Sequence, residues 1–563
     1  MGDAYSELDE GQRGGDVTVV GNRTSPFVIG YAVVLTILAV AAVVLLGVVY
    51  FNDDDDNDSN SATVTPLTEF VWRDDPAYNV DWDFDPVKGE GYTLYNINLT
   101  SGTWLTPTDS STFVYYHWLQ FCVPDELEDP SFAFLWITGG SNDPDSIPTS
   151  TSSEVISMCL GSKTLSFALR QVPNQGMTFQ GDPTQQNRKE DAIIAWTWAH
   201  FINNTLEPDW LARMPMTRAG IRAMDAGQAF WETIRSEDQK PIDRFVVGGA
   251  SKRGWTSWMV GSMNDPRVVG IMPVVAPIAN ITPQMDEQYR SLGFWSWVLY
   301  DYYSLNLMGW LFTDVFQEMT QIIDPLYYQP EMAKIKKFQI GGTNDEFFQP
   351  DALKWYWDGI PGDKLYRIVA GANHGLQVPG ENSEEQVFAA AATFLLSFKE
   401  GFDVTLPTYS WEISEDGQTL TVYCSTAGLV EDEIVVWVSK DKTERDWRAF
   451  TCPDTSSSDC INDDAKWEKA AATKEKTGKY TYTIDTPGEN LYSAFFIELS
   501  YDLVEGYSHF LVSTDVSIVP VGQFSYAPCA VCDCGWDCPP QQQPDSRHLV
   551  ERGIDYDDNK VFA

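Results

Sequence analysis

The sequence predicts an α/β fold with a doubly wound, mostly parallel sheet, followed by a small antiparallel β domain and preceded by one N-terminal transmembrane helix. Three observations support this prediction. Apolar runs of strand length alternate with amphipathic helical runs over residues 65–401, the pattern of a parallel sheet covered on both faces. Over residues 402–520 apolar and polar side chains alternate with period two, as in antiparallel strands. Residues 27–51 are apolar and uncharged, and about twenty such residues can cross a bilayer as a helix.

The charges beside the apolar run predict its orientation. Arg13 and Arg23 precede it, whereas several aspartates follow it within residues 52–64, and basic residues favour the cytosolic side of a membrane. We therefore expect a cytosolic tail over residues 1–26, a polar tether over 52–64, and a single-pass protein with its domains in the extracellular or luminal space. A cleaved signal peptide is the alternative, but the run is long and begins well inside the chain.

The alternation over residues 65–401 also places individual elements. Two stretches, Glu190–Phe201 and Thr217–Ile234, carry apolar residues at helical spacing. The aromatic-rich residues 282–332 interrupt the alternation and form either a cap over a pocket or ordinary packed helices. The expected strands are Phe132–Thr138, Leu165–Gln171, Arg244–Gly248, Val268–Val274, Phe338–Gly341 and Leu365–Val369.

The charge of the chain excludes one class of partner. Its 37 basic and 81 acidic side chains give a net charge of −44, which repels the phosphate backbone of nucleic acids. We therefore expect no nucleic-acid partner.

The nine cysteines indicate an oxidising environment. Cys452 and Cys460 flank a short loop of turn-forming residues, so we expect a disulfide between them. Four more cysteines lie in the tail, residues 521–563, which we expect to be irregular; the cluster CAVCDCGWDC could bind zinc, but we expect disulfides there and no metal. Of the remaining three, Cys122, Cys159 and Cys424, one is left as a free thiol.

Four asparagines lie in acceptor sequences for N-linked glycans, in which serine or threonine stands two residues later. Glycans are added only to segments that reach a lumen, so these sites depend on the expected topology. The four are Asn57, Asn98, Asn203 and Asn280.

A strand, a turn and a helix surround Ser251. The sequence RFVVGGASKRG runs from an apolar strand into a glycine-flanked serine, and WTSWMVGSM continues as a helix. This is the setting of a nucleophile elbow, in which small neighbours permit the sharp turn that exposes the serine hydroxyl. The spacing G-x-S-x-x-G is one residue longer than the usual G-x-S-x-G, and a helix N-cap is the alternative role for this serine.

A nucleophilic serine needs a general base and a group that orients the base. Among the five histidines, His374 follows an apolar strand in RIVAGANHGLQ, and Asp345 follows another in FQIGGTNDEFF. The chain order Ser, Asp, His is that of α/β-hydrolases. We therefore predict a catalytic triad of Ser251, His374 and Asp345; a turn-forming aspartate and a solvated loop histidine are the alternatives.

An oxyanion hole requires backbone N–H groups near the nucleophile. We expect one from Lys252, which follows the serine, and a second from Gly139 or Gly140 in the glycine-rich loop of FLWITGGSN. The side chains of Lys252 and Arg253 either contact an acidic substrate group or form ion pairs.

Several stretches resemble one family. The sequences ITGGSN, LRQVPNQ, EDAIIAWTW, MPMTRAGIRAMD, GGASKRGWTSW, GGTNDEFF and GANHG are similar to those of the PhoPQ-activated pathogenicity-related proteins. The resemblance implies an α/β-hydrolase domain followed by a β domain, with Ser251, Asp345 and His374 at the hydrolase positions. It implies no particular substrate, and the transmembrane run and the cysteine-rich tail are additions to the family pattern.

The expected function is that of a membrane-anchored extracellular or luminal serine hydrolase, which cleaves an ester or peptide bond in a small molecule or peptide without a cofactor. The alternative is a non-catalytic extracellular signalling or binding protein that keeps the hydrolase scaffold and binds a receptor.

Overall fold

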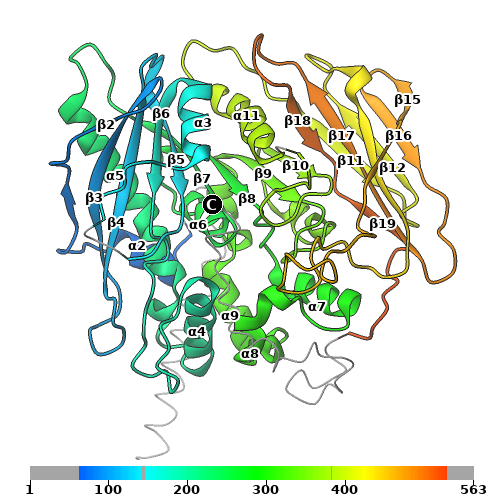
Figure 1. The fold of residues 1–563 in the computed structure, drawn as a ribbon, viewed down its shortest axis with the longest axis horizontal. Helices are drawn as coiled ribbons and strands as arrows, with labels where there is room; N and C mark the ends of the chain where they lie inside the picture. Colours follow the sequence, from blue (N-terminus) through cyan, green and yellow to red (C-terminus); the bar gives the residue numbers. More distant parts are fainter. Residues whose placement is uncertain (1–62, 143–145, 382, 529–563) are drawn as a thin grey trace, which may run out of the picture. The chain divides into compact units, whose positions relative to one another are not determined.

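A mixed sheet of ten strands forms the centre of the fold (Figure 1). The computed structural model describes residues 63–142, 146–381 and 383–528. The order of the sheet is β1-β3-β4-β6-β5-β7-β8-β9-β10, with β2 paired to β3. Strands β6, β5, β7, β8, β9 and β10 run parallel, whereas β1, β2, β3 and β4 are joined by antiparallel pairing. The strands span Asn79–Asp81, Val87–Lys88, Tyr92–Thr103, Val114–Pro124, Asp129–Ile137, Thr164–Leu169, Arg244–Ala250, Val268–Val274, Lys336–Gly342 and Lys364–Val369, from β1 to β10.

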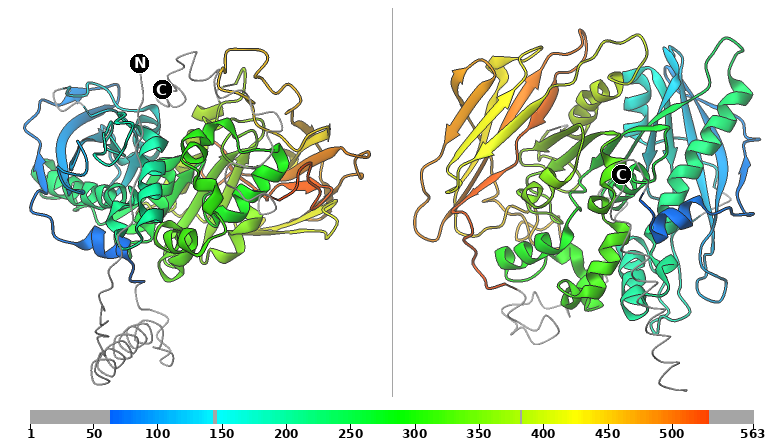
Figure 2. Two further views of the ribbon diagram at one scale, coloured as in Figure 1. Left: turned by 90° about the horizontal axis from the view of Figure 1, so that it is seen from below. Right: turned by 180° about the vertical axis from the view of Figure 1, so that it is seen from behind.

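Helices cover both faces of this sheet (Figure 2). Because side chains alternate along a strand, β5 contributes Leu135 to the apolar cluster beneath α5 (Arg213–Ile234) and α6 (Lys252–Gly261). Its neighbour Trp136 belongs to the cluster beneath α3 (Ser153–Ser162) and α11 (Ser383–Leu396). The remaining α-helices are α2 (Pro66–Trp72), α4 (Glu190–Asn203), α7 (Ile281–Leu292), α8 (Tyr300–Ser304), α9 (Asp314–Ile323) and α10 (Gln329–Met332).

The predicted elements agree closely with these bounds. All six expected strands are present, as β5 to β10, and the helix expected over Glu190–Phe201 is α4. Helix α5 begins four residues before the expected Thr217, at Arg213. Its first turn includes Pro215, and proline is tolerated there because the N–H groups of a first turn have no intrahelical acceptor.

Two antiparallel sheets follow the central sheet along the chain. One has the order β11-β12-β16-β15, and the other has the order β14-β13-β17-β18 with β19 paired to β17. Strand β18 packs against β10 at the edge of the central sheet, and Ser513 Oγ accepts a hydrogen bond from Ile368 N at 2.8 Å. The strands span Tyr409–Ile413, Thr419–Cys424, Val435–Lys442, Glu468–Ala470, Thr473–Lys476, Lys479–Thr483, Tyr492–Tyr501, Phe510–Ser513 and Ser517–Val519, from β11 to β19.

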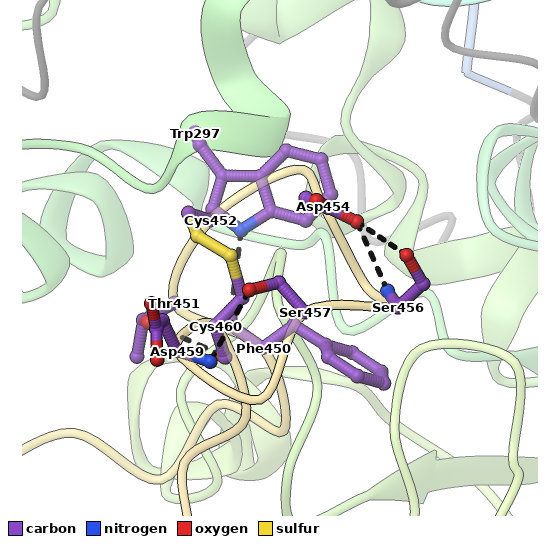
Figure 3. Close-up of a disulfide and its surroundings, with 9 residues drawn as sticks. All are labelled: Trp297, Phe450, Thr451, Cys452, Asp454, Ser456, Ser457, Asp459 and Cys460. Atoms are coloured by element: carbon purple, nitrogen blue, oxygen red, sulfur yellow. Dashed lines mark hydrogen bonds between the residues drawn. A yellow bond between two sulfur atoms is a disulfide. The ribbon is translucent and has the colours of Figure 1, made fainter.

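Two disulfides lie within the described residues. One joins Cys452 and Cys460, and the carbonyl of the nearby Phe450 accepts a hydrogen bond from Trp297 Nε1 at 3.2 Å (Figure 3). The other joins Cys122 in β4 to Cys159 in α3, which leaves Cys424 as the free thiol of the described part. The cysteine cluster of the tail lies outside the described residues.

One part of the predicted fold class is corrected here. Across the part of the chain that the structure describes, no helix is long and apolar enough to cross a membrane. This finding contradicts the expected transmembrane helix and the single-pass membrane location. The run at residues 27–51, on which both expectations depended, lies outside the described residues, as does the expected cytosolic tail.

Candidate active site

Ser251 lies in a sharp turn between β7 and α6. Its backbone angles are φ 55° and ψ −125°, a combination that a residue with a side chain adopts only under strain. Glycines on both sides permit the turn. A Cβ atom on Gly249 would lie 2.6 Å from the Arg253 carbonyl oxygen, and one on Gly254 would lie 2.7 Å from Ala276 Cβ. The second glycine of G-x-S-x-x-G is therefore required where α6 packs against the segment that follows β8.

His374 connects the serine to a carboxylate. Its Nε2 lies 2.9 Å from Ser251 Oγ, and its Nδ1 lies 2.7 Å from Asp345 Oδ2. Asp345 follows β9 and His374 follows β10, so neighbouring parallel strands bring the two side chains to one edge of the sheet. All three residues are buried, and the Phe347 ring lies 4.3 Å from the imidazole, between ring centroids. The structure thus places the three predicted residues in one hydrogen-bonded chain.

Glu346 is a second buried carboxyl at this site, and the sequence analysis did not single it out. Its Oε2 accepts a hydrogen bond from His374 N at 3.0 Å. Burial, together with the neighbouring charge of Asp345, raises the pKa of Glu346 to about 7. Its Oε1 has no hydrogen-bond partner among the described residues, a situation that costs less for a neutral carboxyl than for a carboxylate. The only signal in the sequence was its position directly after Asp345.

The predicted oxyanion donors lie in two loops. Lys252 is the first residue of α6, where the helix dipole favours negative charge. Gly139 and Gly140 follow β5, and the Gly139 carbonyl accepts a hydrogen bond from Gln171 N at 2.8 Å. Neither glycine is among the described residues that line the cavity beside the serine. The oxyanion role of these three residues stays a prediction.

The side chains of Lys252 and Arg253 form buried ion pairs. Lys252 Nζ lies 2.9 Å from Asp191 Oδ2 and 3.1 Å from Glu190 Oε2, and Arg253 Nη2 lies 2.5 Å from Glu190 Oε1. Tyr302 also donates a hydrogen bond to Asp191 Oδ1 at 2.7 Å. The structure therefore shows these basic side chains in ion pairs, which was one of the two roles expected for them.

A cavity of about 60 Å³ adjoins Ser251. Residues from the aromatic-rich segment 282–332 form much of its wall, and the role of this segment as a cap stays a prediction. The wall is largely apolar, and its charged members are Asp191, Arg213 and Lys252. The apolar members are Trp198, Trp255, Ile278, Ile281, Met285, Leu299, Tyr302, Leu307, Met308, Leu311, Phe316, Phe347 and Phe348.

Comparison with known proteins assigns the chain to a family. The family described as PhoPQ-activated pathogenicity-related protein matches residues 67–448. Autocrine proliferation repressor protein A of Dictyostelium discoideum is 34% identical over 469 residues, which cover 81% of this chain and 90% of that protein. The chain belongs to the PhoPQ-activated pathogenicity-related protein family.

Solved structures of esterases are similar to this PhoPQ-activated pathogenicity-related protein at low identity. An acetyl xylan esterase from a Paenibacillus species is 13% identical with a TM-score of 0.38, and the match covers 60% of this chain and 96% of that one. A glucuronoyl esterase from Solibacter usitatus is 15% identical with a TM-score of 0.34, over 58% of this chain and 87% of that one. These likenesses are too distant to indicate a substrate.

Three other histidines of this PhoPQ-activated pathogenicity-related protein lie within the described residues, and each has partners other than Ser251. His117 is fully buried in β4, and burial lowers its pKa to about 4. His200 is paired with Glu207, and His509 is paired with Glu433.

The predicted glycan acceptors differ in exposure. Asn203 is exposed at the end of α4, whereas Asn98 in β3 and Asn280 before α7 are half-buried. Asn57 lies outside the described residues. Glycosylation at these positions stays a prediction.

Proposed function

We propose that this protein is a serine hydrolase that cleaves an ester or peptide bond in a small-molecule or peptide substrate. The observation that carries the proposal is the hydrogen-bonded chain from Ser251 Oγ through both nitrogens of His374 to Asp345. The buried aspartate holds the imidazole so that Nε2 faces the serine hydroxyl. The turn at Ser251 and the adjoining cavity support the same proposal.

The reaction follows from these contacts. As Ser251 Oγ attacks the acyl carbon, His374 Nε2 accepts the hydroxyl proton, and the carbonyl oxygen becomes an oxyanion at the N-terminus of α6. Collapse of the intermediate breaks the bond to the leaving group, which takes the proton from His374. A water molecule then releases the acid by the same sequence of proton transfers and restores the serine hydroxyl. The steps need no cofactor.

The experiment is a screen of esters and peptides followed by kinetics of active-site variants. Because a nucleophile and its base act as a unit, Ser251→Ala and His374→Ala should each lower kcat by about 10⁶, with the double variant hardly worse. Asp345→Asn should lower kcat by about 10⁴ and leave measurable turnover. A Ser251→Ala protein that folds normally and keeps the parent rate would contradict the proposal.

A binding role is the second candidate, because the name of the Dictyostelium discoideum relative describes a repressor of proliferation. A hydrolase scaffold can act by binding alone. A proliferation assay with Ser251→Ala separates the two. Full repression by a variant without turnover would support binding, whereas loss of repression together with turnover would support catalysis.

A further inference from the structure

A buried guanidinium with unfilled hydrogen-bonding groups lies in the wall of the cavity beside Ser251. Arg213, the first residue of α5, is fully buried. Its Nη1 donates to the Lys252 carbonyl at 2.7 Å, and its guanidinium lies over the Trp255 ring at 4.3 Å. Its Nε and Nη2 have no hydrogen-bond partner among the described residues. Since buried N–H groups are nearly always satisfied, this pair indicates a missing acceptor.

Arg213 belongs to a buried group of charged side chains. Five charged side chains are buried together: the cations Arg213, Lys252 and Arg253, and the anions Glu190 and Asp191. Both carboxylates are engaged by Lys252 and Arg253, and Asp191 also accepts the Tyr302 hydroxyl. Asp191 is the one acidic side chain among the described residues of the cavity wall. Among the described residues neither carboxylate accepts a hydrogen bond from Arg213, so its Nε and Nη2 remain available to a ligand in the cavity.

We infer that Arg213 binds a carboxylate of the substrate inside this cavity. The inference rests on the proposed hydrolase function and narrows its substrate class to esters or amides with an apolar chain that ends in a carboxylate. A guanidinium presents parallel N–H groups that match the two oxygens of a carboxylate. A carboxylate also brings a negative charge to the buried guanidinium, and the apolar wall suits the chain that carries it.

The test measures how small ligands protect Ser251 from a fluorophosphonate probe in the full chain. Valerate and valeramide have the same shape, but only valerate carries a charge. We expect valerate to slow labelling on the order of tenfold more than valeramide at equal concentration, because a charge-assisted, bidentate pair is stronger than a neutral hydrogen bond. Equal protection by the two ligands would overturn the inference.

Variants assign the effect to Arg213. Arg213→Met should remove the advantage of valerate, and Arg213→Lys should keep part of it, because the charge stays but the paired donors are lost. Arg235→Met removes a surface arginine, which pairs with Glu232, and should behave as the parent. Unchanged protection by valerate in Arg213→Met would also overturn the inference.

Thermal unfolding gives a second measurement that does not need a reactive serine. Valerate should raise the unfolding midpoint of the parent protein more than valeramide does, since a ligand stabilises the folded state that binds it. If Ser251 is never labelled but valerate still stabilises selectively, the hydrolase proposal fails and the anion site stands. If Ser251 is labelled but valerate neither protects nor stabilises selectively, the anion site fails alone.

Discussion

The ionisation of Glu346 should make the folding stability of the protein depend on pH. Its pKa is about 4.5 when exposed and about 7 in the folded protein, because burial and Asp345 disfavour its charged form. Between these pH values the unfolded chain has released the proton that the folded protein still holds. The contribution of Glu346 to folding stability is therefore full below about pH 4.5 and is lost as pH rises through 7.

Glu346→Gln should remove this dependence. Glutamine keeps an oxygen for the His374 N–H but does not titrate, so the variant should gain about 1–3 kcal/mol relative to the parent between pH 4.5 and 7.5. Urea unfolding across this range measures the difference. Glu237→Gln, at an exposed position, is the control. Parallel stability curves for Glu346→Gln and the parent would contradict the assignment.

Some residues of the site could be predicted from the sequence and others could not. Ser251, Asp345 and His374 each follow an apolar strand, and parallel strands bring such positions to the same edge. Glu346 and Arg213 matter because they are buried, and no local sequence pattern predicts that burial. The ion pairs of Lys252 likewise depend on α4, which lies far from it in the chain.

At the scale of elements, the turn between β7 and α6 depends on Gly254. A Cβ atom there would lie 2.7 Å from Ala276 Cβ and 2.9 Å from the carbonyl oxygens of Gly249 and Val274. We expect Gly254→Ala to destabilise the protein by about 1–3 kcal/mol through overpacking and to lower activity by displacing Ser251. Denaturant unfolding and turnover measure both effects. Gly181→Ala is the control, since a Cβ there has nothing within 4 Å; equal stability of the two variants would contradict the role of Gly254.

The antiparallel strands β3 and β4 were missing from the expected strands for a physical reason. They bury polar side chains, including Asn96, His117 and Gln120, which interrupt an apolar pattern. Gln120 Nε2 donates to Asn96 Oδ1 at 3.2 Å across the two strands. Such residues are compatible with a core only when their partners are present, and the partners come from another strand.

At the scale of the whole molecule, Arg445 connects the segment between β13 and β14 to α7. Its Nη2 lies 2.7 Å from both Glu287 Oε1 in α7 and Asp351 Oδ2, and its Nη1 donates to Ser291 Oγ at 2.8 Å. Lys354 pairs with the same two carboxylates. Removing one cation from this buried group leaves negative charge uncompensated.

Arg445→Met should therefore destabilise the protein by about 3–5 kcal/mol. In the parent we expect the central sheet and the later β sheets to unfold in one transition, because this contact joins them. Calorimetry measures both the midpoint and the number of transitions. Lys479→Met, which breaks a surface pair with Glu475, should lower the midpoint far less, because exposed ion pairs contribute little to stability. Two separate transitions in the parent would contradict the coupling.

The sequence could predict two successive kinds of sheet from the change in period near residue 402. It could not predict how they pack, because the packing depends on charges that meet only in the folded chain. The described residues between 63 and 528 group as one compact unit. The division between residues 401 and 402 therefore stays a prediction.

The measurement that tests the central claim most directly is labelling of the full chain with a fluorophosphonate, followed by mapping of the modified peptide. The proposed triad predicts a single modified residue, Ser251, with no labelling of Ser251→Ala and strongly reduced labelling of His374→Ala. A folded parent protein that leaves Ser251 unmodified, or labelling that persists in Ser251→Ala, would contradict the account.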